Sequence, residues 1–272
     1  MLKIGLSINE SYMNEEFFKS CKSAGIDCIE LSPTEKGHDT LDFDAVAKMI
    51  CANGLETWTY HLPFLPFESL DISRPDLAKY SVEYLSSLIR RAGAAGIKRF
   101  VLHSSGEPID DAERAVRMET AKNSISVLAN VALECGGRLL IENLPRTVLG
   151  KNSDEMLELL SSHPSLRSVF DTNHLLSENA IDFIKKIGHT IESTHVSDYD
   201  LVDEKHWLPG EGAADFTSIF KALEDVGYNG PWLYEVSLTN TPKITRSRSL
   251  TPEDYVRNAK ELFSGAPFTV VK

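Results

Sequence analysis

Between Ser193 and Gly212 the chain combines imidazoles, carboxylates and glycines in a way that packing alone does not require. A short apolar lead-in over 188–196 is typical of a buried strand, and His195 lies at its end. Asp198, His206 and a Gly-Glu-Gly turn follow within a few residues. A strand that ends in metal-type donors and continues into a glycine-rich loop is how a barrel enzyme presents its site.

The same arrangement recurs along the chain, because one apolar run after another is followed by a carboxylate or an imidazole. In a closed barrel the carboxyl ends of the strands meet at one rim, so residues far apart in sequence would gather there. Scattered surface residues would not fall at the end of successive strands. These donors are Glu30, His61, His103, Glu142, Asp171 with His174, His195 with Asp198, and Glu235.

Four of these donors form the sharpest subset, because each lies at the end of an apolar run. A carboxylate in that position is partly desolvated, so it must be paired, protonated or bound to a cation. Three carboxylates and one imidazole form a mostly oxygen shell, which suits Mn²⁺, Mg²⁺ or Co²⁺ and can hold Zn²⁺. Ion pairs at the rim without a metal are the alternative. The predicted ligands of this divalent ion are Glu142, Asp171, His195 and Glu235.

Four histidines near the strand ends are predicted to bind substrate. His61 and His103 each follow a strand, and His174 lies three residues after Asp171. A lone histidine in such a position is also often a polar residue satisfied by its neighbours. His174 could instead bind a second cation, and His206 could instead cap a backbone carbonyl.

The elements that must position these residues alternate strictly between strand and helix, which implies a parallel sheet. Eight strand–helix units in 272 residues imply closure into an α/β fold, a single (β/α)8 TIM barrel with outer helices and one domain over 1–272. Strands are expected at 2–8, 26–31, 55–60, 97–102, 138–141, 166–170, 188–196 and 232–234. Helices are expected at 15–24, 41–52, 76–95, 110–135, 153–160, 179–186, 216–226 and 252–263.

Composition excludes several classes of protein. A net charge of −12 argues against a general nucleic-acid binder, which needs a basic face, and against adhesion to an anionic membrane. No apolar run is long enough to span a bilayer, and we expect a cytoplasmic protein without a signal peptide and with reduced cysteines. Four loop cations could bind a phosphate, but we expect them to be solvated, namely Arg146, Lys151, Arg246 and Arg248.

Five short segments, taken in their order along the chain, resemble the xylose isomerase-like TIM barrels. This is the sugar phosphate isomerase and epimerase group, which shares its fold with the zinc apurinic-site endonucleases. Any one segment is a weak signal, but the ordered set is specific for the superfamily. The segments are Ile141-Glu-Asn143, Phe170-Asp-Thr-Asn-His174, Thr194-His-Val-Ser-Asp198, Leu208-Pro-Gly-Glu-Gly212 and Tyr234-Glu-Val236.

The resemblance implies that the four predicted ligands hold one divalent cation and that Glu142 and Glu235 are the catalytic acid and base on opposite faces of a ketose. It also implies that His174 hydrogen-bonds a substrate oxygen. The resulting hypothesis is a metal-dependent isomerase or epimerase of a small sugar or hydroxy-keto acid, acting by proton transfer through a metal-stabilised enediolate. The expected partner is a small carbohydrate, with no nucleic acid and no membrane. Whether the chain forms a homo-oligomer is left open.

Two features of the sequence bear on particular branches of this superfamily, and we therefore keep alternative activities. The ketose 3-epimerase and hydroxypyruvate isomerase branches have an arginine shortly after the equivalent of His195, and 199–205 contains none. The endonuclease branch uses three zinc ions, and the histidines together with Glu204 fall where several of its additional ligands lie. The alternatives are an abasic-site endonuclease, which the acidic loops disfavour, an inosose-type dehydratase, and a non-catalytic sugar-binding barrel.

Overall fold

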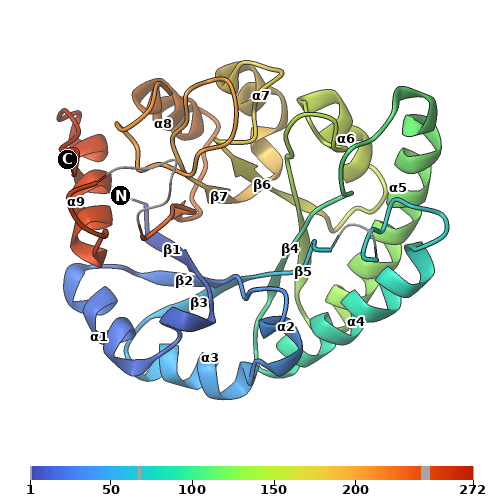
Figure 1. Cartoon of the computed structure of the whole chain (residues 1–272), viewed down its shortest axis with the longest axis horizontal. Coiled ribbons are helices and arrows are strands. Elements are labelled where there is room, and N and C mark those ends of the chain that lie inside the picture. The colour runs from blue at the N-terminus through green and yellow to red at the C-terminus, as the bar shows by residue number, and fades with distance from the viewer. Residues whose placement is uncertain (1, 67–68, 240–245, 272) are drawn as a thin grey trace.

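The computed structural model describes residues 2–66, 69–239 and 246–271. Eight parallel strands lie at the centre and the helices surround them (Figure 1). The strand order is β7-β6-β5-β4-β3-β2-β1-β8, and a parallel bridge between Val196 and Tyr234 joins the two ends. The predicted (β/α)8 barrel is therefore confirmed. The strands are β1 (Ile4–Ile8), β2 (Cys28–Leu31), β3 (Glu56–His61), β4 (Arg99–Leu102), β5 (Arg138–Glu142), β6 (Arg167–Asp171), β7 (Ile191–His195) and β8 (Trp232–Tyr234).

Most helices begin at a polar residue whose side chain accepts a backbone N–H, because the first turn of a helix leaves such groups without partners. Asn14, Asp42 and Asn179 are examples. The helices are α1 (Glu15–Ala24), α2 (Gly37–Thr40), α3 (Phe43–Ala52), α4 (Ala78–Ala94), α5 (Asp111–Glu134), α6 (Ser153–Leu160), α7 (Ala180–Ile187), α8 (Phe216–Asp225) and α9 (Pro252–Ser264), with short 3-10 turns η1 (Glu10–Tyr12) and η2 (Gly188–Thr190).

The expected strand over 188–196 is shorter in the structure, because η2 occupies its first residues and β7 starts at Ile191. Gly188 gives the physical reason. A Cβ at this position would lie 2.7 Å from Cγ2 of Val226, just after α8. The chain therefore passes against the end of α8 before it enters the barrel.

Side chains on a strand alternate between its two faces, and this alternation determines which residues near the carboxyl ends of the strands face the interior of the barrel. Two apolar clusters separate from the main core, one of Cys28, Trp58 and Leu233 and one of Val101, Leu140 and Val169. Two residues after Cys28, Val101, Leu140, Val169 and Leu233, the side chain returns to the same face. The residues found there are Glu30, His103, Glu142, Asp171 and Glu235. β3 departs from this spacing, because its pairing with β2 has a register shift between Ile29 and Glu30.

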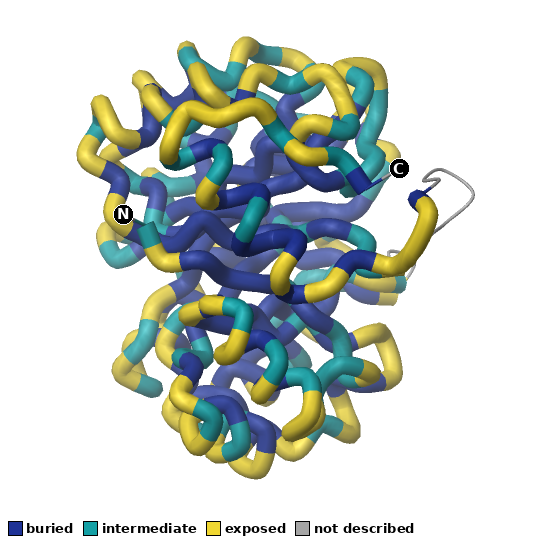
Figure 2. The backbone as a smooth tube through the Cα atoms, turned by 90° about the vertical axis from the view of Figure 1, so that its left-hand side faces the viewer, coloured by how far each residue is buried: buried dark blue, intermediate teal, exposed yellow. Residues whose placement is uncertain are grey.

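The buried backbone runs through the middle of the molecule and the exposed segments lie at its periphery (Figure 2). No helix in the described ranges is both long enough and apolar enough to cross a bilayer.

Candidate metal centre

The four predicted metal ligands come together at the carboxyl ends of β5 to β8. One ligand atom from each lies within 4.8 Å of the others. From His195 Nδ1 the distances are 3.1 Å to Glu142 Oε1, 3.8 Å to Asp171 Oδ2 and 3.6 Å to Glu235 Oε2. Ligands about 2.1 Å from a metal ion lie roughly 3–4 Å from one another, so the set has a suitable size. We call Glu142, Asp171, His195 and Glu235 the quartet.

Each member of the quartet presents one buried atom that has no hydrogen-bond partner in the described chain, and these are the four atoms that face one another. Leaving a buried polar atom unsatisfied costs about 1–3 kcal/mol, so four such atoms in one place need an explanation. A divalent cation would serve all four at once. The residues present therefore fit a metal ion of the hard or borderline type.

Residues around the quartet fix which atoms face its centre. His195 Nε2 lies 3.0 Å from the Glu30 carboxylate, which also accepts from Thr59 Oγ1 at 2.7 Å. Because a carboxylate only accepts, Nε2 carries the proton and Nδ1 turns its lone pair toward the quartet. Asp171 Oδ1 accepts the N–H groups of Asn173 and His174, which leaves Oδ2 facing inward. Glu30, predicted only as a rim donor, orients His195.

Glu142 lies among imidazoles. His61 Nε2 and His103 Nε2 are 3.2 Å and 3.3 Å from its Oε2, and His174 Nδ1 is 3.2 Å from its Oε1. His61 Nδ1 donates to the carbonyl of Leu62 at 2.8 Å, so the neutral ring would turn a lone pair toward a carboxylate. A proton on His61 or a cation nearby relieves that repulsion.

The pKa values in this cluster differ strongly between neighbours. Burial disfavours the charged form of Glu142 and so raises its pKa. The neighbouring imidazoles, His195 above all, outweigh this effect and hold the pKa of Glu142 well below its usual range. Burial raises the pKa of Asp171 well above its ordinary value. Burial opposes charge on His174, but Asp171 and Glu142 raise the pKa of His174 to about 10. In the metal-free protein the cluster therefore holds protons that a bound cation would displace.

Two cavities flank Glu235. The first, about 150 Å³, is lined by three of the predicted substrate histidines, His103, His174 and His206, together with Phe64 and Arg146. The second, about 200 Å³, lies toward β1 and shares His206 and Glu235 with the first. His206 Nδ1 donates to the carbonyl of Glu235 at 3.1 Å, so this residue both caps a backbone carbonyl and lines both cavities.

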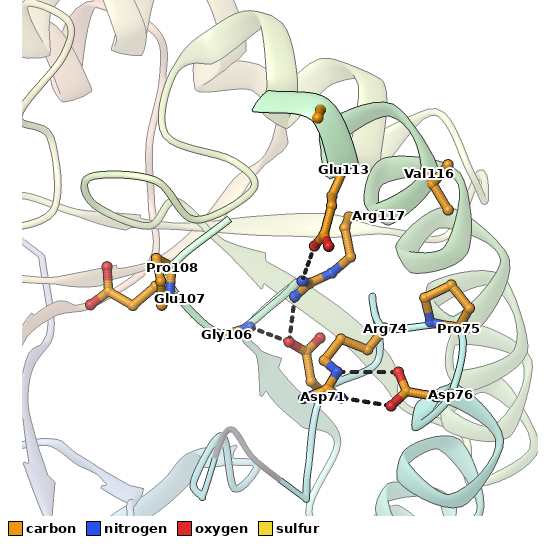
Figure 3. Close-up of a pocket in the computed structure, with 11 residues that line it drawn as sticks. Asp71, Arg74, Pro75, Asp76, Gly106, Glu107, Pro108, Glu113, Val116 and Arg117 are labelled. Atoms are coloured by element: carbon orange, nitrogen blue, oxygen red, sulfur yellow. Dashed lines mark hydrogen bonds and ion pairs between the residues drawn. The ribbon is translucent and has the colours of Figure 1, made fainter. Parts of the chain in front are cut away.

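A larger cavity, about 610 Å³, lies beside the start of α5 and includes Glu107, which also lines the first cavity. Its charged groups neutralise one another, because Arg74 pairs with Asp76 and Arg117 pairs with Asp71 (Figure 3). None of the predicted site residues is among the described residues that line it. Four of the predicted site residues, His103, His174, His206 and Glu235, line the smaller cavities instead.

Asp198 was grouped with the rim donors, but it does not face the quartet. Its Oδ2 accepts the N–H groups of Gly210 and Gly212 at 2.9 Å and 2.7 Å, and its Oδ1 accepts those of Tyr199 and Ala214. A Cβ on Gly212 would lie 2.4 Å from Asp198 Oδ1, which explains the glycine. This carboxylate folds the Gly-Glu-Gly loop that follows His206.

Two of the loop arginines form ion pairs, Arg246 in a buried position and Arg146 in an exposed one. Arg246 is only 5% exposed and binds both oxygens of Glu211 at 2.8 Å and 2.7 Å, so the expectation is wrong for this residue. Arg146 lines the first cavity, with φ of 50°, and pairs with Glu107 and with Glu204 at 3.2 Å. A strained backbone angle at a cavity is often a functional feature, and the sequence gives no signal for it beyond the preceding Pro145.

Three further groups in the described chain have the composition and spacing of metal sites, and two of them share residues with the quartet. Each offers ligand atoms that lie within 4.8 Å of one another. The groups are His61 with His195 and Glu235, His61 with His103 and Glu142, and His174 with Glu204 and His206.

Comparison with known proteins extends this description. A family model described as xylose isomerase-like TIM barrel matches residues 18–262. The fructoselysine 3-epimerase of Escherichia coli O157:H7 is 27% identical over 145 residues, which is 48% of this chain and 53% of that protein. An inosose dehydratase of Clostridium perfringens is 26% identical over 174 residues, which is 52% of this chain and 58% of that protein. The chain thus spans about half the length of these curated relatives.

A solved structure of a D-tagatose 3-epimerase-like protein superimposes with a TM-score of 0.80 over 97% of both chains, at 19% identity. At that identity the likeness concerns the fold.

Proposed function

The chain belongs to the xylose isomerase-like TIM barrel family, and from that premise we propose that it is a divalent-metal-dependent isomerase or epimerase of small sugars. The observation that carries the proposal is the set of four buried atoms without a hydrogen-bond partner in the described chain, which converge beside a cavity. The sugar epimerase among the relatives supports the same reaction class.

A divalent cation held by the quartet would supply positive charge that polarises a substrate carbonyl and acidifies the neighbouring C–H bond. Glu235 lines both cavities and its side chain is 24% exposed, so it is placed to remove that proton. Glu142, whose Oε1 lies 3.1 Å from His195 Nδ1, returns a proton at the new carbon or face. His103 and His174 hold substrate oxygens, and His61 orients Glu142.

Replacing either carboxylate by its amide tests these roles. Glu142→Gln and Glu235→Gln should each lower turnover by at least about 10²-fold, because a positioned general base contributes about 10²–10⁴-fold. The measurement is turnover and solvent-deuterium incorporation over a panel of ketoses and cyclitols in D₂O. Glu158→Gln on α6 is the matched control and should change neither quantity. Near-normal activity in both variants would refute the assignment.

A metal-dependent endonuclease is the second candidate, because the three additional ligand groups give the site more donors than one ion needs. Nicking of an abasic duplex by the metal-loaded protein would support this candidate. The net charge of −12 opposes binding to a phosphodiester backbone. An inosose-type dehydratase would use the same quartet, and a product lighter by one water would identify it.

A further inference from the structure

One of the additional ligand groups lies beside the quartet and consists of His174, Glu204 and His206, which we call the trio. Both of its rings are oriented by backbone carbonyls. His174 Nδ1 lies 3.1 Å from the carbonyl of Asn143, and His206 Nδ1 lies 3.1 Å from that of Glu235. Because a carbonyl only accepts, Nδ1 of each ring carries a proton, and in the neutral form Nε2 keeps a lone pair. Two such imidazoles and a carboxylate are a ligand set that zinc accepts.

A positive charge of the chain itself already lies against this group. Arg146 Nη1 is 3.2 Å from Glu204 Oε1, and the same oxygen is 3.6 Å from His174 Nε2. Arg146 Nη1 is also 2.9 Å from Asp203 Oδ1, and its Nε is 3.0 Å from Glu107 Oε2. One guanidinium thus joins three carboxylates from two other loops beside the first cavity.

The loops on both sides hold these charges in place. Arg146 has a φ of 50°, a region that side-chain-bearing residues rarely adopt. The carbonyls of the two residues that follow it accept hydrogen bonds from Arg114 at 2.8 Å and 3.1 Å. On the other side, the N–H of Lys205, next to Glu204, donates to Asn173 Oδ1 at 3.0 Å. The contact between Arg146 and the trio is therefore built into the backbone of both loops.

Electrostatics makes the guanidinium and a second metal ion alternatives. An ion bound to Glu204 would lie about 2.1 Å from its oxygen, and so at most about 5 Å from Arg146 Nη1. Like charges at this distance repel strongly where the surroundings are partly shielded from water. Without Arg146, three carboxylates would lie beside two imidazoles with no cation between them, an arrangement that attracts a divalent ion.

We propose that Arg146 takes the place of a second metal ion at the trio and so restricts the protein to one divalent ion, at the quartet. The inference rests on the proposed function for the ion at the quartet and adds the residue that sets the number of ions. A clamp of two metal ions about 3.5–4 Å apart serves phosphodiester cleavage, whereas proton transfer next to a carbonyl needs one ion. Arg146 thus favours the isomerase chemistry over the endonuclease chemistry.

Removing the charge of Arg146 tests the proposal without measuring activity. The side chain is 38% exposed, so Arg146→Gln is expected to fold. Calorimetric titration of the metal-free proteins with Zn²⁺, checked by elemental analysis, should give one equivalent for wild type and two for Arg146→Gln. The second ion should bind at least about tenfold more tightly than any further zinc that wild type takes up. Arg146→Lys keeps the charge and should bind one equivalent.

Two further variants locate the second ion and exclude a general effect of charge. Adding Glu204→Gln to Arg146→Gln should abolish the second equivalent, because it removes the oxygen that Arg146 and His174 share. Arg90→Gln, which removes an exposed arginine on α4, is the matched control and should bind one equivalent. The proposal is overturned if wild type or the lysine variant binds two equivalents, if Arg146→Gln binds one, or if the double variant keeps its second ion.

A background without the quartet separates this inference from the proposed function. His195→Ala should bind no zinc at the quartet, and adding Arg146→Gln should restore one equivalent at the trio. Absence of zinc from wild type together with one equivalent in Arg146→Gln would refute the proposed function and support the role of Arg146. One equivalent in wild type with no gain on adding Arg146→Gln in either background would leave the proposed function standing and overturn this inference.

Discussion

At the scale of single residues, the site depends on which atom of each side chain is already occupied. Glu30 accepts the hydrogen bond that His195 Nε2 donates, and two backbone N–H groups donate to Asp171 Oδ1, so Nδ1 and Oδ2 remain for a cation. Such orientation by surrounding groups is as much a part of a metal site as the ligands themselves. The spacing of His195 and Asp171 was readable from the sequence. The pairing of His195 with Glu30, 165 positions away, was not.

Removing the charge on Glu30 tests this orientation. Glu30→Gln is expected to weaken metal binding by about 10–100-fold, because it removes the anion that fixes the ring and raises its basicity. Calorimetric titration of the metal-free protein measures the change. Glu134→Gln, an exposed carboxylate on α5, serves as the control. Equal affinity in wild type and Glu30→Gln would show that His195 needs no such partner.

The pKa values predict how metal binding depends on pH. His174, raised from 6.5 to about 10, stabilises the metal-free fold fully below pH 6.5, and this contribution is lost as the pH rises toward 10. The raised pKa of Asp171 acts in the same direction. The lowered pKa of Glu142 has the opposite effect on the stability of the metal-free fold. Its contribution is present above pH 4.5, the ordinary pKa of a glutamate, and is lost only as the pH falls below that value. The increase in Tm on adding metal should therefore grow as the pH rises above 6.5, and thermal melts at several pH values measure it. A constant or shrinking increase would contradict this account.

At the scale of elements, the loop between β7 and α8 is folded around one buried carboxylate. Asp198 follows a strand end and resembles a ligand in sequence, but four backbone amides satisfy it. Sequence reasoning could not separate these roles, because they depend on how the glycines after His206 turn back. The same holds for Arg246, whose partner Glu211 lies in this loop.

Truncating Asp198 leaves those amides without their acceptor. Asp198→Ala should lower the free energy of unfolding by at least about 3 kcal/mol, because each unsatisfied buried donor costs about 1–3 kcal/mol. Asp225→Ala, at the exposed end of α8, should stay within about 0.5 kcal/mol of wild type. Denaturant unfolding compares the two. If Asp198→Ala is as stable as its control, the loop has another support.

At the scale of the whole molecule, barrel closure is what makes distant residues neighbours. The alternation of strand and helix was sufficient to predict the architecture, and apolar runs ending in polar residues were sufficient to predict the ring of donors. The boundary near Gly188 was missed because contact with Val226 in space, not local propensity, sets it. The position of Arg146 was missed because its three acidic partners come from two other loops.

The most direct test of the account is the metal content of the purified protein after exhaustive dialysis. Wild type is predicted to retain at least one equivalent of a divalent metal. His195→Ala and Asp171→Ala should retain less than a tenth of that, while Glu158→Gln keeps it. Retention of the full equivalent by both quartet variants, or no binding by wild type supplied with Mn²⁺, Co²⁺, Mg²⁺ or Zn²⁺, would contradict the central claim.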